Sequence, residues 1–157
     1  MHVRGSRSRS EIEAFLDETT VPVRLGCRTP AGNPWMVSLW YRRRVPDDAA
    51  DDRPWILECA TASSADLVSF LRADPAVSFE VSTNRPPYRG VRGRGSVTIE
   101  PDPEKETLRS LLERYLGGTD SELAETLLAE ERDEVTITIE PDVVYGWDYS
   151  DRMQESE

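Results

Sequence analysis

Short segments in which apolar and polar residues alternate are the feature that most limits how this chain can fold. In residues 21–27 every second side chain is apolar, namely Val21, Val23, Leu25 and Cys27. A period of two is typical of a β-strand that buries one face. Comparable segments follow at 35–44, 55–61, 76–83, 91–100, 134–140 and 143–149, several of them joined by short connections. The sequence therefore predicts about seven strands, most of them antiparallel.

Four segments between these strands have apolar residues at helical spacing. Their predicted N-terminal caps are Ser10 with Glu13, then Ser63 or Ser64, then Asp102, and finally Thr119 with Glu122. The chain contains no internal repeat or linker, which predicts a single α+β domain over residues 1–157, with a mobile N-terminus over about 1–9 and a C-terminal tail over about 150–157. Because many short strands would leave exposed edges, the sheet is expected to be closed or nearly closed.

The charge of the chain limits its partners. Thirty acidic and 19 basic residues give a formal net charge of −11, and Lys105 is the only lysine. Such an imbalance is typical of halophilic proteins and predicts a haloarchaeal origin. An acidic surface repels nucleic acid and anionic membranes, so neither is expected as a partner. No apolar run has the length of a membrane span or a signal peptide, and a cytoplasmic location is expected.

Histidine and cysteine are too scarce for most metal or nucleophilic sites. The only histidine is His2, and the cysteines Cys27 and Cys59 are far apart in sequence. Each cysteine belongs to an apolar strand pattern, which favours a buried free thiol over redox or metal chemistry. We therefore predict no metal site and no histidine-based catalytic triad. No side chain stands out as a general acid or base, so the catalytic residues are unknown.

A cluster of arginines contrasts with the acidic composition. Within ten positions the chain carries Arg85, Arg89, Arg92 and Arg94. Arg92 and Arg94 share one face of the predicted strand, and the other face carries two glycines, which predict a bulge, a bend or the close approach of a backbone or ligand. Guanidinium groups bind phosphate well. Salt bridges with the many carboxylates are an equally good interpretation, and an RGG-type contact with nucleic acid is much less favoured.

A second anion site is predicted where a strand ends and a helix begins. The segment from Ala60 to Asp66 carries hydroxyl groups and leads into a helix. Unpaired backbone N–H groups and the helix dipole make such a junction favourable for an anion. Ordinary capping is the alternative, because the Asp66 carboxylate could already accept hydrogen bonds from those N–H groups.

Four stretches taken in order resemble a known family. They are "GCRTPAGNPWMVSLWY", "ILECATASSADLVSFLRADPAVSFEV", "YRGVRGRGSVTIEPDPEKETLRSLLERY" and "VTITIEPDVVYGWD". Together they span about residues 20–149 and resemble the pyridoxamine 5′-phosphate oxidase-like FMN-binding split barrels. The run "PYRGVRGRG" resembles the nitroimidazole-resistance-type branch of that family. The resemblance implies a mostly antiparallel split β-barrel with flanking helices, and a homodimer with FMN between its subunits.

The resemblance also implies which residues contact the flavin. Along the isoalloxazine ring it would place the segment from Met36 to Trp40, and so Val37, Ser38, Leu39 and Trp40. Near the flavin chain or phosphate it would place Thr61, Ser63 and Ser64. Where oxidase-type members carry a Ser-Arg-Lys phosphate-binding run, this chain has Ala65, Asp66 and Leu67. Arg89, Arg92 and Arg94 are therefore interpreted as a relocated anion clamp.

The function implied is that of an FMN-binding protein, and of a flavin-dependent oxidoreductase acting on a small molecule. Two alternatives remain open. One is a non-enzymatic protein of the same fold that has lost FMN and binds another ligand or only dimerises. The other is a reductase that depends on a deazaflavin.

Overall fold

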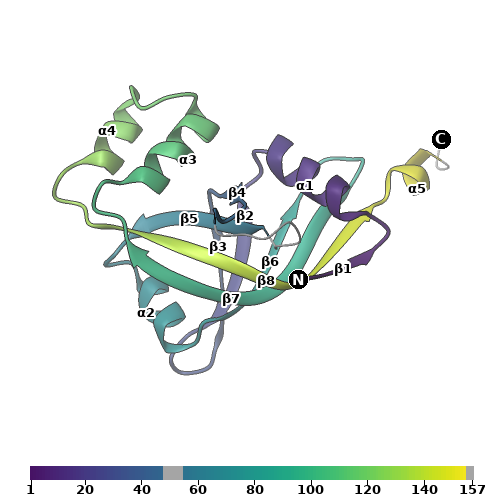
Figure 1. Cartoon of the computed structure of the whole chain (residues 1–157), viewed down its shortest axis with the longest axis horizontal. Coiled ribbons are helices and arrows are strands. Elements are labelled where there is room, and N and C mark those ends of the chain that lie inside the picture. Colours follow the sequence, from purple (N-terminus) through teal and green to yellow (C-terminus); the bar gives the residue numbers. More distant parts are fainter. Residues whose placement is uncertain (48–54, 155–157) are drawn as a thin grey trace.

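The computed structural model describes residues 1–47 and 55–154. Within these ranges eight strands form one sheet (Figure 1). The strands are β1 (His2–Gly5), β2 (Val23–Arg28), β3 (Pro34–Leu39), β4 (Arg42–Arg44), β5 (Ile56–Ala62), β6 (Ala76–Ser82), β7 (Arg89–Pro101) and β8 (Glu134–Asp148). The helices are α1 (Arg9–Glu18), α2 (Asp66–Ala73), α3 (Glu106–Leu116), α4 (Glu122–Leu128) and α5 (Ser150–Gln154).

The sheet curls without closing. Its strand order is β3-β2-β6-β7-β8-β5-β4, with β1 paired to β8 as an additional strand. Every pair is antiparallel except β1 with β8. The two ends of the path, β3 and β4, are not paired with each other, yet only Trp40 and Tyr41 separate them in the chain. The predicted α+β class and mostly antiparallel split barrel are confirmed, and the sheet remains open rather than closed.

The core lies inside the curl of the sheet. The residues that alternate along β2, β6 and β7 fill it, among them Leu25, Phe79 and Val97. Helix α1 adds Ile12, Phe15 and Leu16. Helices α3 and α4 pack on each other around a smaller second cluster. In Figure 1, α1, α3 and α4 lie above the long strands β7 and β8, and α2 lies below them.

The second glycine of the arginine strand lies at a bulge, which is one of the alternatives that the sequence predicted. The pairing of β7 with β8 shifts between Arg94 and Gly95, because Arg94 is opposite Val143 whereas Gly95 is opposite Pro141. A Cβ atom on Gly95 would lie 2.0 Å from the carbonyl oxygen of Glu140, so only glycine allows this approach of the two backbones. The residue without a partner, Asp142, belongs to β8.

The predicted helix starts were wrong in detail. Helix α1 is capped by Ser8, whose side chain and Glu11 form a capping box, and not by Ser10 with Glu13. Both pairs fit the Ser-x-x-Glu pattern. Two ion pairs with i,i+4 spacing, Arg7 with Glu11 and Arg9 with Glu13, form along the first turns when the helix begins after Ser8. These ion pairs stabilise the earlier start.

Three other helix starts also differ from the prediction. The N-cap of α2 is Ala65, without a side-chain hydrogen bond, because a turn closed by the Ala65 N–H and the Ala62 carbonyl delays the helix past Ser63 and Ser64. Asp102 does accept hydrogen bonds from Glu106 and Thr107, but α3 begins only at Glu106. In α4 the N-cap is Ser121, whose hydroxyl accepts from the Ala124 N–H.

The N-terminal segment, expected to be mobile, forms β1. Its residues pair in parallel register with β8, from His2 opposite Val143 to Gly5 opposite Gly146. Arg7 then contacts the Asp148 carboxylate at 3.3 Å, which holds the start of α1 against the end of β8. In the predicted C-terminal tail, residues 150–154 form α5, and residues 155–157 lie outside the described ranges.

Cys27 and Cys59 are buried free thiols, as predicted. Burial raises the pKa of both thiols above their ordinary value. Among the helices in residues 1–47 and 55–154, none is long and apolar enough to cross a membrane.

Candidate functional site

The side of the sheet that faces away from the core carries two rows of residues. Residues paired across neighbouring strands share a face, so the strand registers define each row. The first row runs across β1, β8, β7, β6, β2 and β3 and contains Arg4, Tyr145, Arg92, Glu80, Arg24 and Ser38. The second contains His2, Val143, Arg94, Ser78, Gly26 and Met36. All except Val143 are exposed or half-buried, and we call these two rows the exposed face.

The exposed face is hollowed. An open cavity of about 530 Å³ is lined by Arg24, Gly26, Met36, Ser78, Phe79, Glu80, Arg92, Gly93, Arg94 and Tyr145. A second cavity of about 460 Å³ continues from it past Trp35 and Arg28, and shares Gly26, Met36 and Ser78 with the first. Ligand pockets commonly measure 300 to 1,000 Å³, so each is of a size for a small molecule.

Gly26 keeps the floor between the two cavities low. A Cβ atom at this position would lie 2.6 Å from the Ser78 hydroxyl oxygen. Any larger residue would push Ser78 aside and fill the passage that the cavities share. Next to this floor the Met36 side chain is 67% exposed, so an apolar surface borders the glycine.

One arginine of the exposed face is already engaged. Arg24 donates to the Ser82 hydroxyl at 3.1 Å and to the Asn84 side-chain oxygen at 2.6 Å. Its guanidinium also lies 3.8 Å from the Glu80 carboxylate, which in turn accepts a hydrogen bond from Ser82 at 2.8 Å. This network holds Arg24 in place and occupies the only carboxylate of the two rows.

The other arginines of the two rows have no such support. In the described part of the chain no ion pair or side-chain hydrogen bond joins the guanidinium group of Arg4, Arg92 or Arg94 to another residue, and we call these three the unpaired arginines. The salt-bridge interpretation of the cluster therefore does not hold for Arg92 and Arg94. Unpaired guanidinium groups beside a cavity are suited to bind a phosphate or a carboxylate.

Arg89 belongs to a different environment from Arg92 and Arg94. It lies at the start of β7 on the core side, with its guanidinium 5.6 Å from the centre of the Phe15 ring. Hydrogen bonds from Ser150 lower the pKa of the Asp148 carboxyl group most, and the positive charges of Arg7 and Arg89 lower it further. The three arginines predicted as one clamp are therefore divided between two sides of the sheet.

The residues predicted along a flavin ring also divide. Ser38 lies on the exposed face, whereas Val37 and Leu39 face inward and pack against the core. Trp40 packs with the α3 and α4 cluster and stacks on Tyr115, their ring centres 5.2 Å apart and their planes 13° apart. In this chain Trp40 therefore contributes to the packing that joins β3 to α3.

The hydroxyl residues predicted near the flavin phosphate are Thr61, Ser63 and Ser64. They lie far from the unpaired arginines along the sheet. Thr61 is opposite Val135, which is opposite Pro101 at the end of β7. From there to Arg94 is a further seven residues, about 23 Å along the strand. Ser63 bonds to the Asp133 carbonyl through its backbone N–H, and Ser64 is exposed. Within one copy of the chain these residues do not share a site with Arg92 and Arg94.

Most of the exposed face was missed by the sequence analysis. Arg24, Gly26, Ser78 and Glu80 come from β2 and β6, and Tyr145 comes from β8. A signal was present, because arginine and glycine alternate with the apolar residues of β2. Alternation identifies the solvent side of each strand, but it does not say which strands are neighbours.

Among the described residues no group of three histidine, cysteine or acidic side chains could hold a metal ion. The side chains that line the cavities offer recognition by charge and by apolar contact. An anionic ligand with a flat apolar part would fit the cavities, the glycine floor and the unpaired arginines.

No protein-family model and no curated protein matches this sequence. Solved structures do. A conserved hypothetical protein from Mycobacterium tuberculosis has a TM-score of 0.71 and 24% identity, over 92% of this chain and 86% of that chain. An F420 reductase has a TM-score of 0.64 and 27% identity, over 83% of this chain and 93% of that chain. A putative pyridoxamine 5′-phosphate oxidase from Listeria innocua has a TM-score of 0.57 and 15% identity, over 87% of this chain and 95% of that chain.

Similar folds occur in a putative 5-nitroimidazole antibiotic resistance protein from Bacteroides thetaiotaomicron and in an FAD-binding protein from Mesorhizobium loti, both with TM-scores of 0.58. The chain therefore has the split-barrel fold of the pyridoxamine 5′-phosphate oxidase-like proteins, which confirms the resemblance in its sequence.

Proposed function

We propose that this protein binds FMN or a related flavin on its exposed face and is an oxidoreductase for a small molecule. The observation that carries the proposal is the pair Arg92 and Arg94, unpaired on the wall of a ligand-sized cavity. Both guanidinium groups are exposed and have no partner in the described residues, so an anionic ligand can form charge-assisted hydrogen bonds with them. Flavin or deazaflavin cofactors are named for two proteins of this fold, the F420 reductase and the FAD-binding protein.

The residues present fit such a cofactor. Arg92 and Arg94 would hold its phosphate, with Arg24 fixed beside them by Ser82 and Asn84. Met36 and the Gly26 floor offer an apolar surface against which a ring could lie. A bound flavin supplies the hydride or electron transfer, and the protein binds and orients it.

A second copy of the chain would complete the site. The cavities are open, and Trp35 and Met36 beside them are 50% and 67% exposed. A homodimer that pairs the exposed faces would cover these side chains and exclude water from the ligand. Thr61, Ser63 and Ser64 could then meet the unpaired arginines only if the two groups came from different copies.

A deazaflavin is the second candidate cofactor. The F420 reductase, whose name gives a deazaflavin cofactor, is 27% identical to this chain in the aligned region. The chain also has Asp66 and Leu67 where the oxidase-type family would place its basic phosphate-binding run. The two cofactors share an anionic tail and differ in the ring, so direct competition between them identifies the one preferred.

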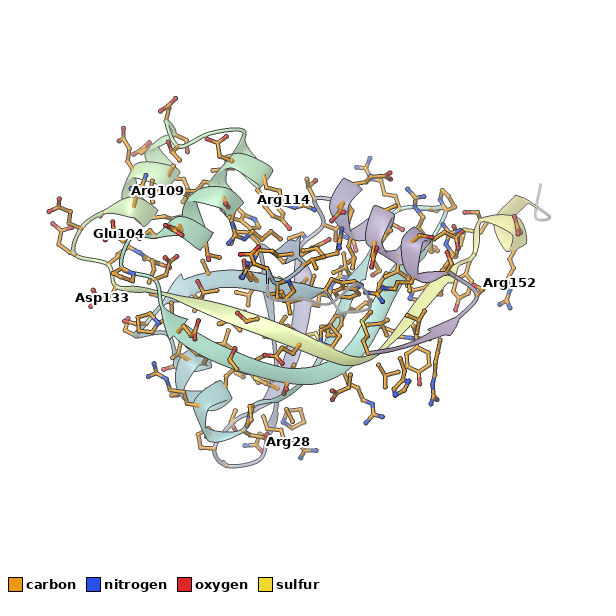
Figure 2. The ribbon with its side chains drawn as sticks, in the orientation of Figure 1. Arg28, Glu104, Arg109, Arg114, Asp133 and Arg152 are labelled. Atoms are coloured by element: carbon orange, nitrogen blue, oxygen red, sulfur yellow. The ribbon has the colours of Figure 1, made fainter. Side chains whose placement is uncertain are left out.

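Titration of the purified protein at high salt tests the proposal. FMN, riboflavin and F420 are each added while flavin absorbance and fluorescence are followed. We expect FMN or F420 to bind, and Arg94→Gln to weaken that binding roughly tenfold to a hundredfold. Riboflavin, which lacks the phosphate, should bind the parent and the variant alike. Arg109→Gln is the matched control, because Arg109 lies on α3 far from Arg28 of the exposed side (Figure 2). Failure of all three compounds to bind would leave only the non-enzymatic alternative.

A further inference from the structure

The second cavity extends along three strands, away from the residues that it shares with the first cavity. Two positions beyond those shared residues lie Arg28 on β2, Pro34 on β3 and Ala76 on β6, which line the second cavity only. Side chains two positions apart lie on the same side of a strand, so Arg28 lies on the same side of β2 as the glycine floor. Arg28 is exposed, and Figure 2 shows it at the lower edge of the molecule.

The acidic residues of the neighbouring strands do not pair with Arg28. Within residues 1–47 and 55–154, no ion pair or side-chain hydrogen bond joins its guanidinium group to another residue. Asp74, just before β6, accepts a hydrogen bond from the Ala76 N–H at 3.1 Å. Glu140 and the exposed bulge residue Asp142 lie on β8, three strand spacings from β2, which is about 14 Å. A ligand is therefore the acceptor that Arg28 can still gain.

Arg28 and Arg94 lie at different ends of the joined cavities. Arg94 is opposite Ser78, and Ser78 is opposite Gly26, so Arg94 and Gly26 are two strand spacings apart. Arg28 is two positions farther along β2, which separates the Cα atoms of Arg28 and Arg94 by about 12 Å. A phosphate held between Arg92 and Arg94 on β7 therefore leaves Arg28 available for a second anion.

Apart from Arg28, the lining of the second cavity is mostly apolar. It contains Pro34, Met36 and Ala76, one hydroxyl group, that of Ser78, and no acidic residue. The flexible Met36 side chain adapts to apolar groups of different shapes. A cation or a sugar would find few partners on such a lining. An apolar molecule with one negative charge at its end fits both the lining and Arg28.

We propose that the second cavity binds the substrate of this protein, and that the substrate is an apolar carboxylic acid whose carboxylate pairs with Arg28. A guanidinium group forms two parallel hydrogen bonds with a carboxylate, and the two charges neutralise each other. The inference rests on the proposed function, in which a flavin ring lies against Met36 and the Gly26 floor. Both residues also line the second cavity, so an acid held by Arg28 contacts the ring across that floor.

Calorimetric titration of the full chain without flavin tests the pairing with Arg28. The probes are 4-phenylbutyrate and the neutral 4-phenylbutanamide, which has nearly the same shape, at one fixed concentration of potassium chloride. The acid should bind about tenfold more tightly than the amide. Arg28→Gln should lower the affinity for the acid to that for the amide, Arg28→Glu should lower it further, and Arg28→Lys should keep part of it. Arg109→Gln, the matched control, should behave like the parent.

The same titration on protein saturated with FMN or F420 tests the position of the acid. The flavin-loaded parent should bind 4-phenylbutyrate at least as tightly as the flavin-free parent, because the two ligands occupy different cavities. The acid should also change the flavin absorption spectrum, since it contacts the ring. Flavin-loaded Arg28→Gln should show no such change at the same concentration of acid.

The outcomes separate this inference from the proposed function. Equal affinity for acid and amide, or equal affinity of the parent and Arg28→Gln for the acid, overturns the inference and leaves flavin binding intact. Displacement of the acid by flavin, or a loss of flavin affinity in Arg28→Gln, assigns Arg28 to the anionic tail of the cofactor and also overturns it. An acid that binds without changing the flavin spectrum is no substrate of this site. If the acid binds through Arg28 and neither flavin binds, the proposed function fails and the cavity remains a site for acids.

Discussion

Two groups of arginines in this molecule have opposite environments. On β4, three consecutive arginines are all paired: Arg42 and Arg44 donate to the Glu58 carboxylate at 2.7 and 3.0 Å, and Arg43 donates to Asp17. On β7, Arg92 and Arg94 have no partner in the described residues. The denser cluster is therefore the structural one. Local concentration of arginine says little about ligand binding. What decides it is whether a carboxylate within reach is still available, because Glu80 opposite Arg92 is already engaged by Arg24 and Ser82.

Arg114 extends the paired group and shows what such arginines do. Its guanidinium donates to the carbonyl oxygens of Leu16 and Thr19 at 2.8 and 2.6 Å, and to that of Asp17 at 3.0 Å. These carbonyls end α1, where a positive charge is favourable for the helix dipole. Figure 2 shows Arg114 on α3, on the side facing α1. Paired arginines thus join elements of the fold, whereas the unpaired arginines are available to a ligand.

The largest effect is expected where two paired arginines share one carboxylate. Glu58 is 4% exposed, and replacing it with alanine removes the carboxylate shared by half-buried Arg42 and exposed Arg44. We expect Glu58→Ala to lower the free energy of unfolding by about 3 kcal/mol. Urea unfolding at neutral pH measures this, and an unchanged midpoint would show that these arginines are no more structural than those of β7.

A somewhat smaller loss is expected at Arg114. Methionine fills a similar volume but donates no hydrogen bonds, so three carbonyls at the end of α1 lose their donor. Arg114→Met should lower the free energy of unfolding by about 2 kcal/mol. Arg114→Lys, which restores one donor and the charge, should recover part of it. Equal stability of the methionine variant and the parent would contradict the capping role.

The cluster around Arg114 also predicts sensitivity to alkaline pH. Burial, and to a lesser extent the neighbouring Tyr115, raises the pKa of Tyr41 well above its ordinary value. Above pH 10 the unfolded chain releases this proton and the folded chain keeps it, so the unfolded state binds fewer protons and stability falls as pH rises. Tyr41 alone should lower the free energy of unfolding by up to about 1.4 kcal/mol per pH unit, until the pH reaches the pKa of Tyr41 in the folded state.

Urea unfolding at pH 9 and pH 11 measures that slope. Tyr41→Phe should reduce it, at the cost of the hydrogen bond from Tyr41 to the Leu16 carbonyl, about 1 kcal/mol at every pH. Tyr88→Phe, at a tyrosine that is 40% exposed, is the control. An equal slope in the parent and Tyr41→Phe would show that Tyr41 does not titrate differently in the two states.

The smallest effect on stability is expected for the unpaired arginines. Arg92→Gln and Arg94→Gln remove no hydrogen bond or ion pair within the described chain, so each should change the free energy of unfolding by less than about 0.5 kcal/mol. Together with a loss of FMN affinity, this result would separate a ligand site from a structural one. A loss of more than 1 kcal/mol, about as large as one buried hydrogen bond, would remove the distinction drawn between β4 and β7.

The sequence predicts the two sides of each strand well, because alternation is a local property. Val91 and Val97 are buried and Arg92 and Arg94 exposed, as their positions indicate. Helix starts were less predictable, since overlapping Ser-x-x-Glu patterns at Ser8 and Ser10 are equivalent until tertiary contacts select one. The pairing of β1 with β8 could not be predicted, because nothing in residues 2–5 specifies a distant partner.

The candidate site was predictable only in part for the same reason. Arg92 and Arg94 were named from their strand, but Arg24 and Glu80 join them through the order β2-β6-β7, which depends on how the whole sheet folds. Arg89 shares a sequence cluster with them and still lies on the other side, since it is three positions from Arg92 and five from Arg94, and an odd difference in position changes the face of a strand.

The bulge in β8 determines which insertions and deletions this protein can tolerate. Before Asp142 the inward side chains of β8 have odd numbers, such as Ile137 and Ile139, and after it Val144 is inward and Tyr145 outward. Deleting Asp142 would reverse this phase and carry Tyr145 into the core and Val144 to the ligand side. A substitution at Asp142 would leave the phase intact. In homologous sequences the length of the segment between Ile139 and Val144 should therefore vary less than the residues within it.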